Sequence, residues 1–109
     1  MTSIPTKLSL SPARRRLIEL MQSINFGRLE NLTVRGGEPT FDPPPRVVRE
    51  VKFGAENGPR PESAVGDFKL KAQVVDLCRE FDRLGDGTVL TLEVKHGLPF
   101  RMLVSEAAA

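Results

Sequence analysis

The chain of 109 residues has no tryptophan and no tyrosine, a single cysteine, Cys78, and a single histidine, His96. One cysteine excludes an internal disulfide and a cysteine-rich metal site. One histidine argues against a conventional zinc site or a histidine-based catalytic triad. We therefore expect no metal and no cofactor. Because phenylalanine is the only aromatic residue type, the core must consist mainly of leucine, valine and isoleucine.

Long apolar runs are also missing. No stretch approaches the roughly 20 apolar residues of a membrane-spanning helix, and the N-terminus has no apolar run of signal-peptide length. We expect a cytoplasmic protein with no membrane partner, which suits a lone thiol.

Neither sign of charge is in large excess, since 16 lysines and arginines face 14 acidic residues. The distribution is nevertheless uneven. Residues 1–60 hold ten basic and six acidic side chains, whereas residues 61–109 hold six and eight. Either the two halves attract each other, or the first half presents a basic surface to a polyanion.

The segment from Leu17 to Pro39 occurs twice. A shift of sixty positions, without a gap, aligns its apolar, glycine and proline positions with those of a second segment. Leu17, Met21, Ile24, Gly27, Leu29, Leu32, Val34, Gly37 and Pro39 fall on Leu77, Phe81, Leu84, Gly87, Val89, Leu92, Val94, Gly97 and Pro99. Each copy predicts a helix, a glycine break, a strand, a glycine turn and a return strand.

In the first copy, Ser11-Pro12 is a helix start, and we expect a helix as far as Ile24. The pattern then changes to strict alternation over 28–35, with Glu30, Leu32 and Val34 on one face and Leu29 on the other. Gly36-Gly37 predicts a tight hairpin turn. We expect a return strand over 38–41, where Pro39 requires an edge or an outward position, and a third strand over 46–53.

In the second copy, we expect Asp67 to cap a helix over 68–84. A strand over 88–95 follows, with Leu90, Leu92 and Val94 on one face, and then a turn at His96-Gly97. The return strand over 98–104 alternates, and Phe100 and Met102 are expected on its apolar face. Cys78 is expected to pack as a small apolar residue, and His96 to serve as a turn residue.

A helix with a hairpin cannot bury its own apolar faces, but two such units can share one core. We therefore predict the α+β class: a two-layer sandwich of internally duplicated helix–hairpin units in the order α-β-β-β-α-β-β, whose antiparallel sheet is covered by two helices. The expected organisation is a flexible arm (1–10), one duplicated domain (11–104) and a disordered tail (105–109). Within the domain, copy one covers 12–53, a mobile linker 54–66 and copy two 67–104.

The first copy resembles the YezD-like small bacterial proteins of uncharacterised function. The resemblance rests on the helix end Ile24-x-Phe26-Gly27, on Leu29, Val34 and Gly37, and on the charged segment 46–53. The second copy departs from this pattern, with Leu84-Gly85-Asp86-Gly87 at the break. The resemblance implies a small bacterial helix-plus-hairpin protein, and it transfers no activity and no site.

Two function classes remain from the sequence. The first is a non-catalytic binding module for nucleic acid or another acidic partner. The second is a protein-interaction or homodimerising module that pairs through an edge strand, either 46–53 or 98–104. An enzyme is not expected, because the acidic residues are scattered and no nucleophile motif occurs. For Arg14 to Arg16 a solvated helix face is the favoured interpretation, and an anion-contacting patch is the alternative. The candidate anion-contacting residues are eight basic residues of the first half: Arg14, Arg15, Arg16, Arg28, Arg35, Arg46, Arg49 and Lys52.

Overall fold

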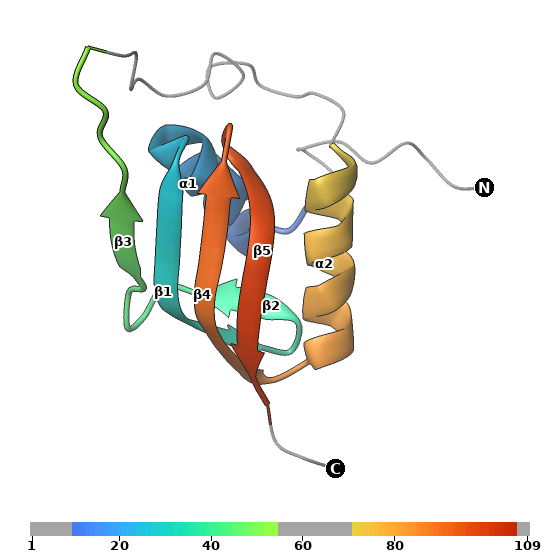
Figure 1. Cartoon of the computed structure of the whole chain (residues 1–109). Coiled ribbons are helices and arrows are strands. Elements are labelled where there is room, and N and C mark those ends of the chain that lie inside the picture. Colours follow the sequence, from blue (N-terminus) through green and yellow to red (C-terminus); the bar gives the residue numbers. More distant parts are fainter. Residues whose placement is uncertain (1–9, 55–70, 107–109) are drawn as a thin grey trace.

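The computed structural model describes residues 10–54 and 71–106 and has the predicted order of elements (Figure 1). Most of the predicted arm, linker and tail lies outside these described residues. The second helix begins at Ala72 and not at 68, because Lys71 is extended and forms the N-cap, so the predicted cap at Asp67 is wrong. The elements are α1 (Pro12–Ile24), β1 (Gly27–Arg35), β2 (Glu38–Thr40), β3 (Arg46–Arg49), α2 (Ala72–Leu84), β4 (Gly87–Lys95) and β5 (Leu98–Ser105).

The five strands form one antiparallel sheet in which β1 is central. One side of β1 pairs with β4, and β4 pairs in turn with β5. The other side of β1 is shared, because β3 pairs with Gly27–Glu30 and β2 pairs with Thr33–Arg35. Since β3 ends at Arg49, the third strand is shorter than the predicted 46–53.

The sequence repeat is a structural repeat. The bounds of α2 and β4 are those of α1 and β1 moved by sixty positions. The ladder between β1 and β4 runs from Gly27 opposite Val94 to Val34 opposite Gly87, so the two strands contribute equivalent residues. The α+β fold of two helices on an antiparallel sheet is confirmed.

Each hairpin turn is tied to the end of the other copy's helix. The Gly37 N–H donates to the Gly85 carbonyl over 2.7 Å, and the Gly97 N–H donates to the Asn25 carbonyl over 2.9 Å. Gly37 and Gly97 both have positive φ, as a tight hairpin turn requires. These two reciprocal bonds join the copies at both ends of the β1–β4 ladder.

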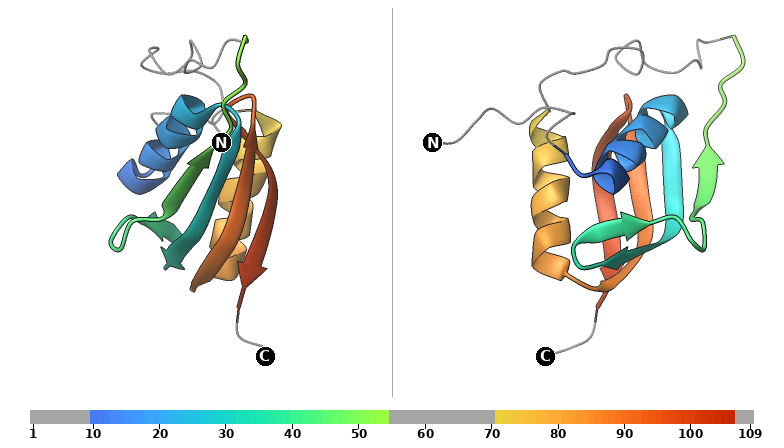
Figure 2. Two further views of the ribbon diagram at one scale, coloured as in Figure 1. Left: turned by 60° about the vertical axis from the view of Figure 1, so that its left-hand side comes forward. Right: turned by 180° about the vertical axis from the view of Figure 1, so that it is seen from behind.

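Both helices lie on the same side of the sheet (Figure 2). Their apolar stripes meet the inward side chains of β1 and β4 and form the core. Met21 and Phe81, which are equivalent in the repeat, are both 0% exposed at its centre. The buried apolar residues are Leu17, Ile18, Met21, Ile24, Leu29, Leu32, Val34, Val74, Leu77, Phe81, Val89, Leu92 and Val94.

The expected strict alternation of inward and outward side chains is wrong in β1, β4 and β5. Leu29 and Leu32 are both fully buried, because the chain turns through a positive φ at Asn31 between them. Leu90 is exposed, because the β4–β5 register shifts between Val89 and Thr91 and leaves it as an extra residue. A second register shift, between Glu93 and Val94, lies opposite Phe100, which is 59% exposed rather than in the core.

The other local predictions have mixed outcomes. Pro39 lies on the edge strand β2, as expected, but it is buried and does not point outward. Ser105 belongs to β5, and the Glu106 carboxylate lies 3.1 Å from a terminal nitrogen of Arg83, so the chain is still ordered where the tail was expected to begin. His96 occupies the hairpin turn with φ 56°, as expected.

Candidate anion-binding face

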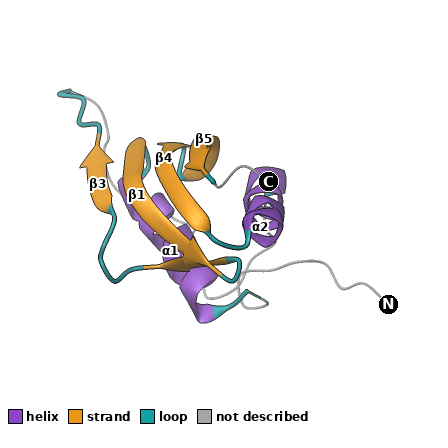
Figure 3. Cartoon of the chain, turned by 90° about the horizontal axis from the view of Figure 1, so that it is seen from below, coloured by secondary structure: helices purple, strands orange, loops and turns teal. Residues whose placement is uncertain are grey.

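The helices leave one face of the sheet uncovered, as Figure 3 shows, and this face is called here the open face. Two rows of side chains cross the strands on it. In the first row, Arg28 lies between Val48 of β3 and Glu93 of β4, and Glu93 lies opposite Arg101 of β5. In the second row, the order is Arg46, Glu30, Thr91 and Leu103. Charged residues of both copies are therefore adjacent on this face.

Ion pairs connect several of these charges. The Arg28 Nε lies 2.8 Å from a Glu30 carboxylate oxygen, and the Arg46 Nε lies 3.6 Å from the other. The Arg101 Nε lies 2.6 Å from Glu93. The hydrogen bond from Arg28 holds the pKa of the Glu30 carboxyl below its usual value, and the charge of Arg46 adds to this.

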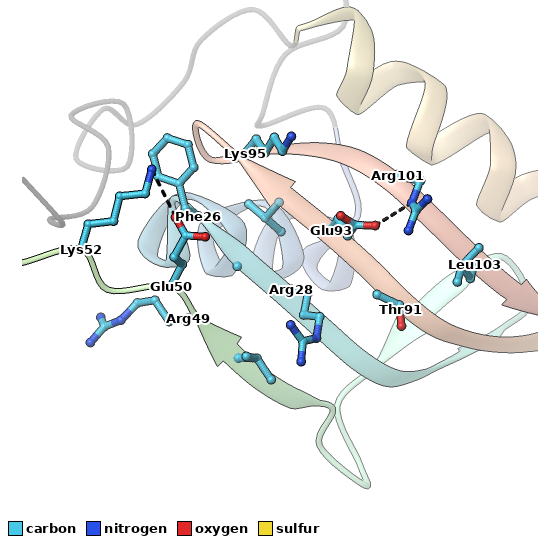
Figure 4. Close-up of a pocket in the computed structure, with 13 residues that line it drawn as sticks. Phe26, Arg28, Arg49, Glu50, Lys52, Thr91, Glu93, Lys95, Arg101 and Leu103 are labelled. Carbon is cyan, nitrogen blue, oxygen red and sulfur yellow. Dashed lines mark hydrogen bonds and ion pairs between the residues drawn. The ribbon is translucent and has the colours of Figure 1, made fainter.

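A broad hollow of about 860 Å³ lies on the open face, between the segment after β3 and strand β5 (Figure 4). Five basic and two acidic side chains line it, together with Phe26 and Thr91. The charged residues are Arg28, Arg49, Lys52, Lys95 and Arg101, with Glu50 and Glu93.

Two of the basic side chains in the hollow have no carboxylate partner among residues 10–54 and 71–106. Arg49, at the end of β3, and Lys95, at the end of β4, are both exposed and make no ion pair there. By contrast, Lys52 lies 3.4 Å from Glu50. Within the described residues, the hollow therefore has a local excess of positive charge that no carboxylate neutralises.

The predicted basic residues divide between the two layers of the fold. Arg28, Arg49 and Lys52 line the hollow, and Arg46 lies beside them on β3. The run from Arg14 to Arg16 lies on α1, in the helical layer, and does not join them.

Within that run, Arg16 is exposed, and its guanidinium carbon lies 4.3 Å from the centre of the Phe41 ring. The Arg15 side chain is partly buried on the same helix. Arg35 is at the far end of β1, where it lines a smaller hollow with Asp86 and Thr88. None of these three side chains lines the hollow that holds Arg49 and Lys95.

Arg14 holds the fold together. Only 14% of its side chain is exposed, and one terminal nitrogen donates to the Gly37 carbonyl over 2.7 Å and to Asp82 over 2.5 Å. Its Nε lies 3.1 Å from Glu38, whose carboxylate also accepts a hydrogen bond from Ser11. Arg14 thus joins α1, the first hairpin turn and α2, and it is not available to an anion.

Replacing Arg14 by methionine is expected to lower the free energy of unfolding by about 1–2 kcal/mol, because the Gly37 carbonyl loses its charged donor while Asp82 remains solvated. Chemical denaturation measures the change. Arg79→Met, at an exposed arginine 4.0 Å from Asp76, is the matched control and should stay within about 0.5 kcal/mol of the parent protein. Equal effects of the two substitutions would contradict the structural role of Arg14.

Lys95 and Arg101 were missed at the sequence level, because the second half was judged by its net negative charge. The repeat itself contains the signal that could have found them. If the equivalent strands 28–35 and 88–95 pair with each other as antiparallel partners, Arg28 falls near Glu93 and the following hairpin brings Arg101 beside it.

Other reactive groups give little support for catalysis. Cys78 is half-buried beside the core, and burial raises the pKa of its thiol, although Arg14 partly opposes this shift. The His96 ring packs against Phe26. In the described part of the chain, no group of three or more histidine, cysteine or acidic residues is placed to hold a metal ion. Neither described helix is long and apolar enough to cross a membrane.

No family model, no curated protein and no solved structure matches this chain. The resemblance of the first copy to YezD-like proteins therefore stays a prediction.

Proposed function

We propose that the protein is a small non-catalytic binding module of the bacterial cytoplasm that holds a polyanion, above all a nucleic acid, on the open face of its sheet. The observation that carries the proposal is the hollow in which basic side chains outnumber acidic ones and in which Arg49 and Lys95 have no carboxylate partner in the part of the chain that the structure describes. The basic surface differs from the one expected from sequence, since it draws on both copies and omits Arg14 to Arg16.

The chemistry of the face suits phosphate groups. Guanidinium groups bind phosphates through two parallel hydrogen bonds, and a lysine acts as a point charge. Arg28 and Arg101 bond to Glu30 and Glu93 through Nε. Among the described residues, no other protein group bonds to these two guanidinium groups. A phosphate can therefore be contacted by the terminal nitrogens without first breaking both ion pairs.

Binding to a fluorescein-labelled oligonucleotide should be tight at about 50 mM salt and much weaker at about 200 mM, because phosphate contacts release counterions. In the double variant Arg49→Ser/Lys95→Ser, the slope of log K against log salt should fall by about 2, since each lost contact contributes about 0.9. Fluorescence anisotropy across a salt series measures both effects.

The matched control is Arg16→Ser/Arg79→Ser, which removes the same net charge from exposed positions on α1 and α2. Its salt slope should equal that of the parent protein. An equal loss of slope in both double variants would mean that only net charge matters, and absence of binding to any nucleic acid at low salt would end the proposal.

Self-association is a second candidate, because the edge strand β5 exposes apolar side chains. Leu103 is 50% exposed on β5 and Leu90 is 46% exposed on the neighbouring strand. A free edge with apolar neighbours is a common pairing surface. Sedimentation at tens of micromolar protein tests it: a mass of twice 12.0 kDa would support a homodimer, and a strictly monomeric mass would exclude it.

A further inference from the structure

The two ends of the β1–β4 ladder have the same backbone but different side chains. At each end a helix terminus meets a hairpin turn, and the bonds from Gly37 to Gly85 and from Gly97 to Asn25 are equivalent in the repeat. The side chains at the two ends can therefore be compared with each other within one molecule. A residue type that the fold itself requires should occur at both ends, and one that occurs at a single end has to be explained differently.

At the end where β1 begins and β4 ends, two phenylalanines, a histidine and two lysines lie close together. The Phe26 and His96 rings meet edge to face with centres 4.8 Å apart, and the Lys52 Nζ lies 5.5 Å from the Phe26 ring centre. The Lys95 Nζ lies 4.0 Å from the Phe100 ring centre. We call these five residues the aromatic end of the ladder.

The equivalent positions at the opposite end hold no ring. A shift of sixty places Asp86 at the position of Phe26, Gly36 at that of His96 and Thr40 at that of Phe100. There, the Gly36 N–H donates to Asp86 over 2.8 Å, and the turn forms equally well. The helix–turn junction thus does not need aromatic residues, and the rings of the aromatic end are free to serve another purpose.

The rings of the aromatic end are placed for contact with a ligand. Phe26, Lys52 and Lys95 line the hollow described above, as Figure 4 shows. Phe100 is 59% exposed and lines a second groove, between β5 and α2, next to the hollow. Lys95, which lines the hollow, lies over its ring and connects the two. Phe53, directly after Lys52, is 97% exposed. Rings that are exposed beside lysines offer both parts of a nucleotide a partner, since bases stack on rings and phosphates attract cations.

We propose that the polyanion is a single-stranded nucleic acid, whose bases stack at the aromatic end while its phosphates follow Lys95, Arg101 and Arg28 along the open face. This inference rests on the proposed function and narrows it. In a duplex the bases are already stacked on one another and cannot reach the rings. A polyanion without bases can use the basic side chains but gains nothing from Phe26 and Phe100.

The absence of tryptophan and tyrosine makes the stacking step directly measurable. In the variant Phe100→Trp, all tryptophan fluorescence arises from position 100, and the aromatic ring is retained. Titration with a single-stranded oligonucleotide should quench and saturate this fluorescence, whereas titration with heparin should not. The control variant is Phe41→Trp, because Phe41 also lies under a cation, Arg16, but in the helical layer. Its fluorescence should not respond.

Affinity provides the second measurement. Phe100→Leu keeps an apolar side chain and the net charge, so it should weaken binding of the single strand by about tenfold and leave the salt slope and heparin binding unchanged. The single strand should also bind better than a duplex of the same sequence.

The results distinguish a failure of base stacking from a failure of polyanion binding. If the oligonucleotide binds with the expected salt slope but does not quench Phe100→Trp, or if duplex and heparin bind as tightly as the single strand, base stacking is wrong and polyanion binding stands. If none of the three polyanions binds at low salt, both proposals fall.

Discussion

Replacing Phe81 by alanine is expected to lower the free energy of unfolding by about 3–5 kcal/mol, the usual cost of truncating a buried phenylalanine. Phe81 is 0% exposed and packs at the centre of the core shared by both copies. Because small domains have total stabilities of about 5–15 kcal/mol, this loss removes a large part of the stability. Urea denaturation followed by circular dichroism measures it.

Phe100→Ala is the matched control, since it removes the same atoms from a side chain that is 59% exposed. Its cost should stay below about 1 kcal/mol, as is usual for surface substitutions. Equal costs at the two positions would show that Phe100 is a core residue, as strict alternation predicted, and would contradict the register shift in β5.

Replacing Gly27 by alanine is expected to separate β3 from β1. A Cβ at this position would lie 2.1 Å from the Val48 carbonyl oxygen and 2.9 Å from the Arg49 Cα, and backbone atoms cannot move aside as a flexible side chain can. The expected cost is about 1–3 kcal/mol, as for other overpacked sites. The Glu50 N–H, which donates to the Phe26 carbonyl over 2.8 Å, should then exchange rapidly with solvent in hydrogen-exchange measurements.

This substitution also links the fold to the open face, because Arg49 ends the displaced strand and Lys52 follows it. Oligonucleotide binding should weaken together with the loss of protection at Glu50. Gly36→Asn is the control: a Cβ there meets nothing within 4 Å, and asparagine tolerates its positive φ of 57°. If Gly27→Ala leaves both the exchange of Glu50 and the affinity unchanged, β3 does not hold one side of the binding face.

The architecture could be predicted because the same pattern of elements occurs twice in the sequence. Helix, glycine break, strand and turn recur at a spacing of sixty residues, and the bounds of α1 and α2 follow the same spacing. Two amphipathic units that share a core leave few arrangements other than two helices on an antiparallel sheet. The polar and glycine positions of the turns were equally informative, since positive φ restricts them to few residue types.

The sequence did not show on which face of the sheet several side chains lie. A β-bulge interrupts the alternation of inward and outward side chains, and no particular residue type marks its position. Leu90 and Phe100 have the apolar character of core residues, and only the pairing of β4 with β5 shows that they are displaced. Asn31 was a weak signal, as asparagine accepts positive φ more readily than most residues.

The candidate site was predicted in part for a related reason. Counting charges along the sequence placed Arg14 and Arg28 in one predicted basic surface, although α1 and the open face lie on opposite sides of the sheet. The same counting left Arg101 out of the predicted basic surface, because residues 61–109 carry a net negative charge. Strand pairing, which joins residues far apart in sequence, decides which charges meet.

The most direct test of polyanion binding on the open face is a titration of the ¹⁵N-labelled protein with a single-stranded oligonucleotide at low salt, followed by amide chemical shifts. The shifts should concentrate at Arg28, Arg49, Lys95 and Arg101 and leave the exposed surfaces of α1 and α2 unchanged. Shifts that concentrate around Arg15 and Arg16, or a spectrum that does not respond, would contradict the account.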